Sequence, residues 1–414
     1  MGKMSKDEME ILLLYEEEFS ENSVPEDHKL IPLPDGSVLE EVDEADTRQQ
    51  AKVWYRLSDV ILIVTIALCT NQKSFNLMSE FVELEKDWFS KYIDLSHGVP
   101  SGETIRRLLN LVKPELVQNV FRSVNERLSA TSTAQQIAID GKSVKGFYDS
   151  TSNRIMHSVS LYQTELGISL GQLTTVKEDG KEQGELQVIP QLLEMLDCRD
   201  KVFTIDAGGC YKAIVDKIRE KRADYIITVK NNQPRLFAYA ESLFQETEAE
   251  VPDFSTKSKG HGRSETRHYS VRSVPKNAVF AHEWNGLSSI VKVVSTRKIK
   301  GESEPSEFTR YFITSIPAER LSETARKIRS HWGIENQLHW SLDVTFSEDK
   351  QRSHKGWNAE NLVILRRAAL SFLRSLDRKA VVGRLLLRAT LDRNFRSKLV
   401  ELLFPPVEPE NGGV

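Results

Sequence analysis

Between residues 135 and 234, short apolar runs rich in β-branched residues alternate with amphipathic stretches, and this alternation restricts the fold more than any other feature. Runs of the first kind predict strands, and stretches with apolar residues every three or four positions predict helices. In chain order the pattern gives three strands, a helix, a strand, a helix and a last strand. The sequence therefore predicts an α/β domain with largely buried strands.

The segments before and after this α/β part have different sequence patterns. Residues 1–45 are acidic and interrupted by proline, which predicts a flexible arm. Residues 46–130 have a helical pattern, 235–315 a β-rich one, and 316–404 are helical with a strongly basic end. Because the β-rich stretch interrupts the α/β pattern, we interpret it as an insertion between the two parts of one core, 135–234 and the start of the last segment.

The composition argues against a membrane protein. The longest apolar run, Val60–Cys69, is ten residues long, whereas about 20 are needed to cross a bilayer. It predicts a buried helix instead. The three cysteines form no CxxC or similar metal-binding pattern, which argues against a structural zinc ion. We expect a cytoplasmic protein without a membrane partner.

The net charge of −4 hides an uneven distribution. Residues 1–46 contain fifteen acidic residues and three lysines, so the remainder of the chain carries a net charge of +8. A basic body suits a polyanionic partner. Arginine and lysine are dense in the C-terminal helices, which favours contact with a phosphate backbone; a charged, solvent-facing surface is the alternative.

Two of the predicted strands end in aspartate. Asp140 follows an apolar run in the string IAIDGK, and Asp206 does so in FTIDAGG. Ligands of open α/β sheets bind at the carboxyl ends of strands, and carboxylates there can share the divalent cations that catalyse phosphoryl transfer. For either aspartate alone, a turn residue or a helix cap is the simpler interpretation.

A third candidate lies in the string HWGIENQLHWSLDVTFSED at 331–349. Glu335, His339 and Asp343 are spaced four residues apart beside an apolar face, so they would form one stripe on a helix. A carboxylate in that stripe could reach a metal at the edge of the sheet. A zinc site that includes His331 is disfavoured, because no separate fourth ligand is present.

Basic and donor-rich turns supply candidates for binding DNA. Exposed arginine, lysine and amide side chains can contact phosphates, whereas solvated loops and scaffold packing are the alternatives. Trp332 and Trp340 either pack in the core or stack on a base. The predicted DNA-binding residues are Arg106, Arg107, Lys142, Lys230, Asn232, Arg263, Arg267, His331, Trp332, Asn336, His339, Arg366 and Arg367.

These strings together resemble a known family. IDGK around Asp140, TIDA around Asp206, VKNNQP, HGRSETR and above all HWGIENQLHWSLDVTFSED look like the H-repeat-associated (ISAs-type) family of bacterial insertion-sequence DDE transposases. The resemblance covers nearly the whole chain after the acidic arm. Residues 46–125 look like the associated N-terminal domain of that family.

The resemblance implies an RNase-H-like catalytic core with a β-rich insertion, preceded by a small helical N-terminal domain and followed by basic C-terminal helices. Asp140, Asp206 and Glu335 would be the catalytic acids and the metal ligands, with Mg²⁺ as cofactor and Mn²⁺ able to substitute. The expected partner is double-stranded DNA, at transposon ends and target, bound by a homodimer that is then associated with the nucleoid. Whether a nearby acid assists or replaces Glu335 stays open; these acids are Asp343, Glu348 and Asp349.

The implied reaction is two-metal-ion hydrolysis at insertion-sequence ends, followed by strand transfer of the 3′-hydroxyl into target DNA. Two alternatives stay open: a catalytically silent DNA-binding regulator derived from a transposase, and a nuclease without strand transfer. The wider superfamily often has an arginine four residues before the catalytic glutamate and a lysine seven after it. Here those positions hold His331 and Leu342 instead.

Overall fold

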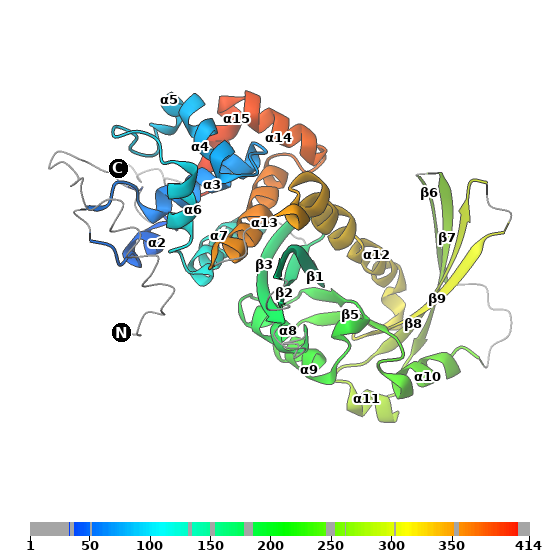
Figure 1. Ribbon diagram of the computed structural model, residues 1–414. Helices are drawn as coiled ribbons and strands as arrows, with labels where there is room; N and C mark the ends of the chain where they lie inside the picture. The colour runs from blue at the N-terminus through cyan, green and yellow to red at the C-terminus, as the bar shows by residue number, and fades with distance from the viewer. Residues whose placement is uncertain are drawn as a thin grey trace, which may run out of the picture.

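The computed structural model describes residues 33, 37–49, 52–130, 135–149, 154–177, 185–245, 253–260, 262–301, 304–351 and 356–404. A body of helices lies next to a long sheet that helices cover on its two faces, and α12 runs along the sheet (Figure 1). Most of the predicted acidic arm lies outside the described residues.

One mixed sheet joins the described strands in the order β3-β2-β1-β4-β5-β9-β8-β7-β6. β1 pairs antiparallel with β2, and β2 with β3, whereas β1, β4 and β5 run parallel. Three antiparallel strands followed by two parallel ones in this order form an RNase-H-like core, which confirms the predicted fold class. The core elements are β1 (Gln136–Asp149), β2 (Arg154–Gln163), β3 (Ile168–Lys177), α8 (Glu185–Glu194), β4 (Val202–Ile205), η2 (Ala207–Gly209), α9 (Lys212–Glu220) and β5 (Asp224–Val229).

The β-rich insertion extends the core sheet instead of forming a sheet of its own. β9 pairs antiparallel with β5, and β8, β7 and β6 follow as an antiparallel meander. These strands reach away from the core as an arm (Figure 1). Its elements are α10 (Pro234–Ser242), β6 (Phe254–Gly260), β7 (Arg263–Ser273), α11 (Val279–Glu283), β8 (Ser289–Ile299) and β9 (Ser306–Thr314).

The N-terminal and C-terminal helices share one hydrophobic core, which the sequence did not predict. α3 is buried at every position, as its apolar run predicted, and α13 packs against both α3 and α7. No helix among the described residues is both long and apolar enough to cross a membrane. The helices are α2 (Glu40–Glu44), α3 (Leu57–Cys69), α4 (Phe75–Leu84), α5 (Lys86–Phe89), α6 (Gly102–Leu109), α7 (Pro114–Ala130), α13 (Asn358–Leu376), α14 (Val382–Leu391) and α15 (Arg393–Glu401).

Helices cover both faces of the core sheet. α8 and α9 pack on one face, and α12 packs on the other through Leu321, Ala325 and Ile328. After α12 the chain continues in two π-helical segments and a short 3₁₀ turn before it reaches α13. The 3₁₀ turn η3 (Ala318–Arg320) leads into α12 (Leu321–His331). The π-helical segments are η4 (Ile334–His339) and η5 (Ser341–Thr345), and the 3₁₀ turn after them is η6 (Glu348–Lys350).

A groove of about 390 Å³ between α7, β3, α8 and α13 contains a carboxyl group with a shifted pKa. Burial, and then the charge of Glu115, raise the pKa of Glu360 from 4.5 to about 7. The folded state therefore binds the proton more tightly than the unfolded chain does. The resulting stability is fully present below the unfolded pKa and is lost as the pH rises through about 7.

We expect Glu360→Gln to remove this loss. Near pH 8 the variant should have a free energy of unfolding roughly 2 kcal/mol higher than the wild type, because the amide oxygen can still accept the hydrogen bond from Thr174 Oγ1. Urea unfolding in acid and at mildly alkaline pH measures the difference. The same pH dependence in both proteins would show that Glu360 does not cause it.

Candidate active site

The two aspartates predicted from the sequence lie beside each other on neighbouring parallel strands. Asp206 directly follows β4, as predicted, but the prediction that Asp140 ends a strand is wrong, because β1 continues past it in its pairing with β2. Ile139 and Ile205 are register partners in β1 and β4, so Asp140 and Asp206, each the next residue, extend from backbones about 5 Å apart. The isoleucines belong to the core that α8 and α9 cover, and side chains alternate along a strand. Both carboxylates therefore belong to the opposite face of the sheet, which α12 covers.

The last turn of α12 is fixed on this face by polar contacts. Gln136 Nε2 donates hydrogen bonds to the Lys327 carbonyl over 2.7 Å and to Thr204 Oγ1 over 3.1 Å. Ser330 Oγ donates to Gln136 Oε1, and His331 Nδ1 lies 2.9 Å from Thr204 Oγ1. These contacts set the place over the sheet at which η4 begins.

The π-helical segment that follows brings its polar stripe to the two aspartates. His339 Nδ1 lies 3.6 Å from Asp140 Oδ2, and Glu335 is close enough to Asp206 for that charge to raise its pKa. The sequence predicted this stripe on an α-helix. The structure forms it on π-helical turns, which are rare and recur at functional sites.

The loop after β4 holds Asp206 at the surface of the core. Its carboxylate caps η2 by accepting a hydrogen bond from the Gly208 amide over 2.9 Å. Gly209 packs so closely that a Cβ there would lie 2.4 Å from Ile205 Cγ2. Asn232 Nδ2, from the turn after β5, donates to the Ala207 carbonyl over 2.7 Å. The neighbouring strand end therefore supports this loop.

Burial and charge set the protonation of the groups around the aspartates. Burial raises the pKa of Glu335, the charge of Asp206 raises it further, and Arg310 lowers it. Burial lowers the pKa of His331 to about 4. Burial, and then the charges of Arg367 and Lys142, lower the pKa of His339 to about 3. Both imidazoles are therefore neutral near pH 7.

A groove of about 810 Å³ begins beside Asp206. It lies between the loop after β4, the turn after β5 and strand β9, and it is lined by basic, amide and aromatic side chains and by one acid, Glu307. Two predicted DNA-binding residues, Lys230 and Asn232, line it together with Arg310, Tyr211 and Phe308. A groove with this lining, next to carboxylates, can accept a polyanion.

Three other predicted DNA-binding residues lie inside the protein. Lys142, Arg366 and Arg367 are 8%, 3% and 2% exposed. Lys142 and Arg367 form ion pairs with Glu348, and Arg366 donates to Gln351. This burial favours a role in joining β1, η6 and α13 over a role in contacting DNA.

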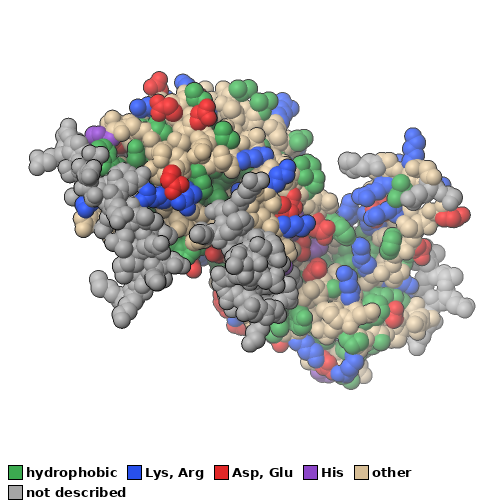
Figure 2. Space-filling view, viewed as in Figure 1, with side chains coloured by type: hydrophobic (Ala, Val, Ile, Leu, Met, Phe, Trp, Pro, Cys, Tyr) green, Lys and Arg blue, Asp and Glu red, His purple; other side chains and the backbone are tan. Residues whose placement is uncertain are grey.

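The remaining basic candidates lie on two other elements, and one of them, Arg267, is buried as well, at 8% exposed. Arg106 and Arg107 are on α6 in the helical body, and Arg106 pairs with Glu103. Arg263 and Arg267 are on β7, where Arg267 pairs with Glu265. Burial lowers the pKa of Arg329 on α12, and the charges of Arg267 and Arg263 lower it further. Lys and Arg side chains lie over the arm of strands β6–β9 (Figure 2).

The aromatic and amide candidates lie in and around η4, and Trp332, at the end of α12, lies beside strand β9. The Arg310 guanidinium stands 5.2 Å from the centre of the Trp332 ring, and the exposed Asn336 donates to the Trp332 carbonyl over 3.0 Å. Trp340 is 53% exposed, so the core-packing interpretation of this residue is wrong. Sequence reasoning missed Arg310 and Arg329. Arg310 could have been noticed as an arginine among the polar residues that begin an otherwise apolar strand.

The chemistry of these carboxylates fits a divalent cation. Among the described residues, no group of three or more His, Cys, Asp or Glu side chains is arranged to hold a metal ion. Mg²⁺ needs only one or two carboxylates when substrate phosphates supply other oxygens. Asp206 and Glu335 offer oxygen donors and repel each other, and a cation bound between them would relieve that repulsion.

Comparison with known proteins places the chain in a family. Residues 131–372 match the family described as Transposase DDE domain, and residues 37–124 match DDE_Tnp_1-associated. In Escherichia coli K12, "Putative protein YbfL" is 34% identical and "H repeat-associated putative transposase YhhI" 33% identical; each match covers 86% of this chain and 95% of the relative. "Putative transposase YncI" of Escherichia coli O157:H7 is 35% identical, over 82% of this chain and 86% of that protein.

Among solved structures, the piggyBac transposase synaptic complex with hairpin DNA matches at a TM-score of 0.41 and 10% identity, covering 96% of this chain and 82% of that one. This likeness is too distant to carry an argument. The sequence matches are enough to assign the family, because the DDE domain covers more than half of the chain. The chain belongs to the H-repeat-associated family of DDE transposases.

Proposed function

We propose that this transposase hydrolyses DNA at the ends of an insertion sequence and then joins the freed 3′-hydroxyl to target DNA. Asp140, Asp206 and Glu335 are the proposed catalytic acids and ligands of Mg²⁺, for which Mn²⁺ can substitute. The observation that carries the proposal is the meeting of Asp140 on β1 and Asp206 at the end of β4 with the η4 stripe on one face of an RNase-H-like sheet.

The residues around the acids prepare the site for a charged substrate. Bound divalent ions would activate the attacking oxygen and stabilise the leaving oxygen. Asp206 and Glu335 provide negative charge that is only partly offset by Arg310. His331 anchors η4 on Thr204, and His339, neutral near pH 7, occupies the place beside Asp140 without adding a positive charge.

DNA would enter along the groove beside Asp206. Lys230 is exposed at its rim, and a lysine there can neutralise one phosphate. Because transposition acts on two ends, we also propose that two copies of the chain assemble on paired ends; the mass of the complex on end DNA measures this.

Replacing Lys230 with alanine is expected to weaken DNA binding about equally for all sequences. The slope of log affinity against log salt should become shallower by about 1, because one phosphate contact is lost. Binding measured across a salt series tests this, with Lys91→Ala, an exposed lysine on the helical body, as the matched control. A slope equal to that of the wild type would remove Lys230 from the interface.

The experiment that tests the function uses labelled DNA carrying the ends of the element. We expect nicking at the ends in Mg²⁺, no nicking in EDTA, and none with Glu335→Ala. Specific binding without cleavage in Mg²⁺ or Mn²⁺ would favour the catalytically silent regulator. Cleaved ends that are never joined to target DNA would favour the nuclease without strand transfer.

A further inference from the structure

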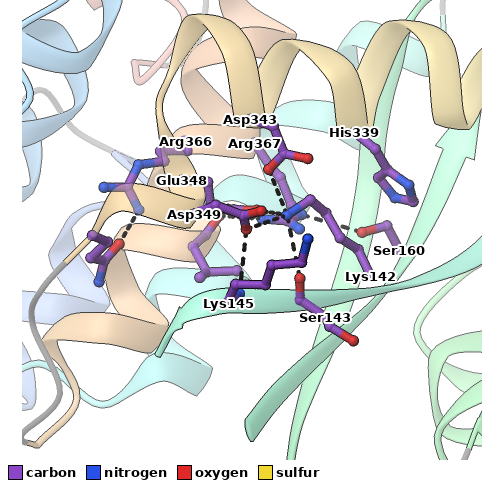
Figure 3. Close-up of polar contacts among 12 residues, drawn as sticks. Lys142, Ser143, Lys145, Ser160, His339, Asp343, Glu348, Asp349, Arg366 and Arg367 are labelled. Atoms are coloured by element: carbon purple, nitrogen blue, oxygen red, sulfur yellow. Dashed lines mark hydrogen bonds and ion pairs between the residues drawn. The ribbon is translucent and has the colours of Figure 1, made fainter. Parts of the chain in front are cut away.

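A buried lysine at the end of the site is surrounded by carboxylates. Lys142 Nζ lies 2.7 Å from Asp343 Oδ1, 3.1 Å from Asp349 Oδ1 and 3.3 Å from Glu348 Oε2 (Figure 3). Burial lowers the pKa of this lysine, but the three acids outweigh that effect and raise it. The ammonium group therefore stays charged and neutralises part of the acidic cluster.

An arginine on α13 completes the charge balance. Arg367 Nη1 lies 2.7 Å from Glu348 Oε1, and Arg367 Nε donates to Ser160 Oγ on β2 over 3.2 Å. Glu348 is 0% exposed, and a buried carboxylate requires paired charges. We call Lys142, Asp343, Glu348, Asp349 and Arg367 the lysine clamp.

The backbone around the lysine clamp is packed too closely to slide. A Cβ on Gly146 would lie 2.7 Å from the Gln351 carbonyl oxygen and 2.9 Å from that of Glu348. Asp349 Oδ1 also accepts a hydrogen bond from the Lys145 amide over 3.3 Å. The second half of β1 and the loop after η5 therefore hold each other in one register.

The lysine clamp lies on the two elements that carry the proposed catalytic acids. Lys142 is two residues after Asp140 and therefore on the same face of β1, and Asp343 is eight residues after Glu335 in the same stripe. His339, which lies between Glu335 and Asp343 in this stripe, contacts Asp140. A shift of η5 along β1 would move the whole stripe relative to both aspartates.

We propose that the lysine clamp is a positioning device that sets Glu335 opposite Asp140 and Asp206, an inference that rests on the proposed function. In this assignment Lys142 is a positioning residue and not a DNA contact. Asp343, Glu348 and Asp349 hold the Lys142 ammonium in the lysine clamp, and none of them replaces Glu335 as a metal ligand. Residues that orient metal ligands commonly affect metal affinity or activity by about 10–100-fold when mutated.

The test compares Asp343→Asn, Lys142→Asp and the charge-swapped double variant Lys142→Asp/Asp343→Lys with the wild type. Lys350→Met, an exposed lysine of the same loop, is the matched control. Mn²⁺ binding is followed by electron paramagnetic resonance on the full chain with end DNA. Cleavage as a function of Mn²⁺ concentration, DNA affinity and thermal unfolding are measured on the same samples.

We expect Asp343→Asn to raise the half-saturating Mn²⁺ concentration by about tenfold or more, with DNA affinity unchanged and cooperative unfolding retained. The charge-swapped variant should recover most of that loss relative to Lys142→Asp. A metal ligand at position 343 would not be rescued by a lysine there, so absence of rescue overturns the proposal. Normal Mn²⁺ dependence in folded Asp343→Asn and Lys142→Asp also overturns it.

The same samples separate this proposal from the proposed function. A wild-type chain that neither binds Mn²⁺ nor cleaves end DNA refutes both. A wild type that does both, beside lysine-clamp variants that behave like Lys350→Met, refutes the lysine clamp alone.

Discussion

Replacing Asp206 with asparagine is expected to reduce metal-dependent cleavage by about a thousandfold or more while DNA binding is retained. The change removes one charged oxygen of a proposed metal ligand, and metal-ion stabilisation of a phosphoryl-transfer transition state is worth several kcal/mol, with about 1.4 kcal/mol for each tenfold in rate. The fold should survive, because the asparagine side-chain oxygen can still accept the hydrogen bond from the Gly208 amide.

Single-turnover cleavage of end DNA in Mg²⁺ measures this effect. Asp197→Asn is the matched control, because this aspartate is exposed before β4 and forms an ion pair with the nearby Arg199. We expect it to cleave at the wild-type rate. Cleavage by Asp206→Asn within a few-fold of the control would exclude Asp206 from the catalytic site.

The largest expected effect on stability comes from Arg367→Met. Burial alone would raise the pKa of Glu348, yet the charges of Arg367 and Lys142 hold it below its usual value, so this acid is ionised in the core. Removing the arginine leaves a buried carboxylate paired with a lysine that it shares with two other acids. Breaking a buried pair in this way costs about 3–5 kcal/mol of unfolding free energy.

Urea unfolding measures that loss, with Arg378→Met as the control, since Arg378 is exposed after the same helix. The control should change stability by less than about 0.5 kcal/mol. Adding Glu348→Gln to Arg367→Met should recover part of the loss, because the uncompensated charge disappears. A loss of similar size in both single arginine variants would refute the buried-pair explanation.

Much of the fold could be predicted from local sequence pattern. The strand and helix order of the core follows from the spacing of apolar residues, and the uninterrupted apolar run of α3 led directly to a helix buried all round. Periodicity shows which face of a helix is apolar but not which partner covers it. For that reason the shared core of the N-terminal and C-terminal helices, and the pairing of β9 with β5, were not predicted.

The candidate site was predictable where an acidic residue ends an apolar run and less so elsewhere. Asp140 and Asp206 could be singled out because each ends an apolar run, and the structure brings them side by side. Arg366 and Arg367 carry the same charge as surface arginines, and nothing local marks them as buried. The π-helical turns depend on contacts with β1 that lie about 200 residues away in sequence.

Anomalous scattering from Mn²⁺ in a crystal of the chain with end DNA would locate the bound ion. We expect a peak between the carboxylates of Asp140 and Asp206, with Glu335 turned toward it and the Lys142 ammonium still held by its acids. A peak among Asp343, Glu348 and Asp349, or DNA-bound crystals in Mn²⁺ with no peak at Asp140, would contradict this expectation.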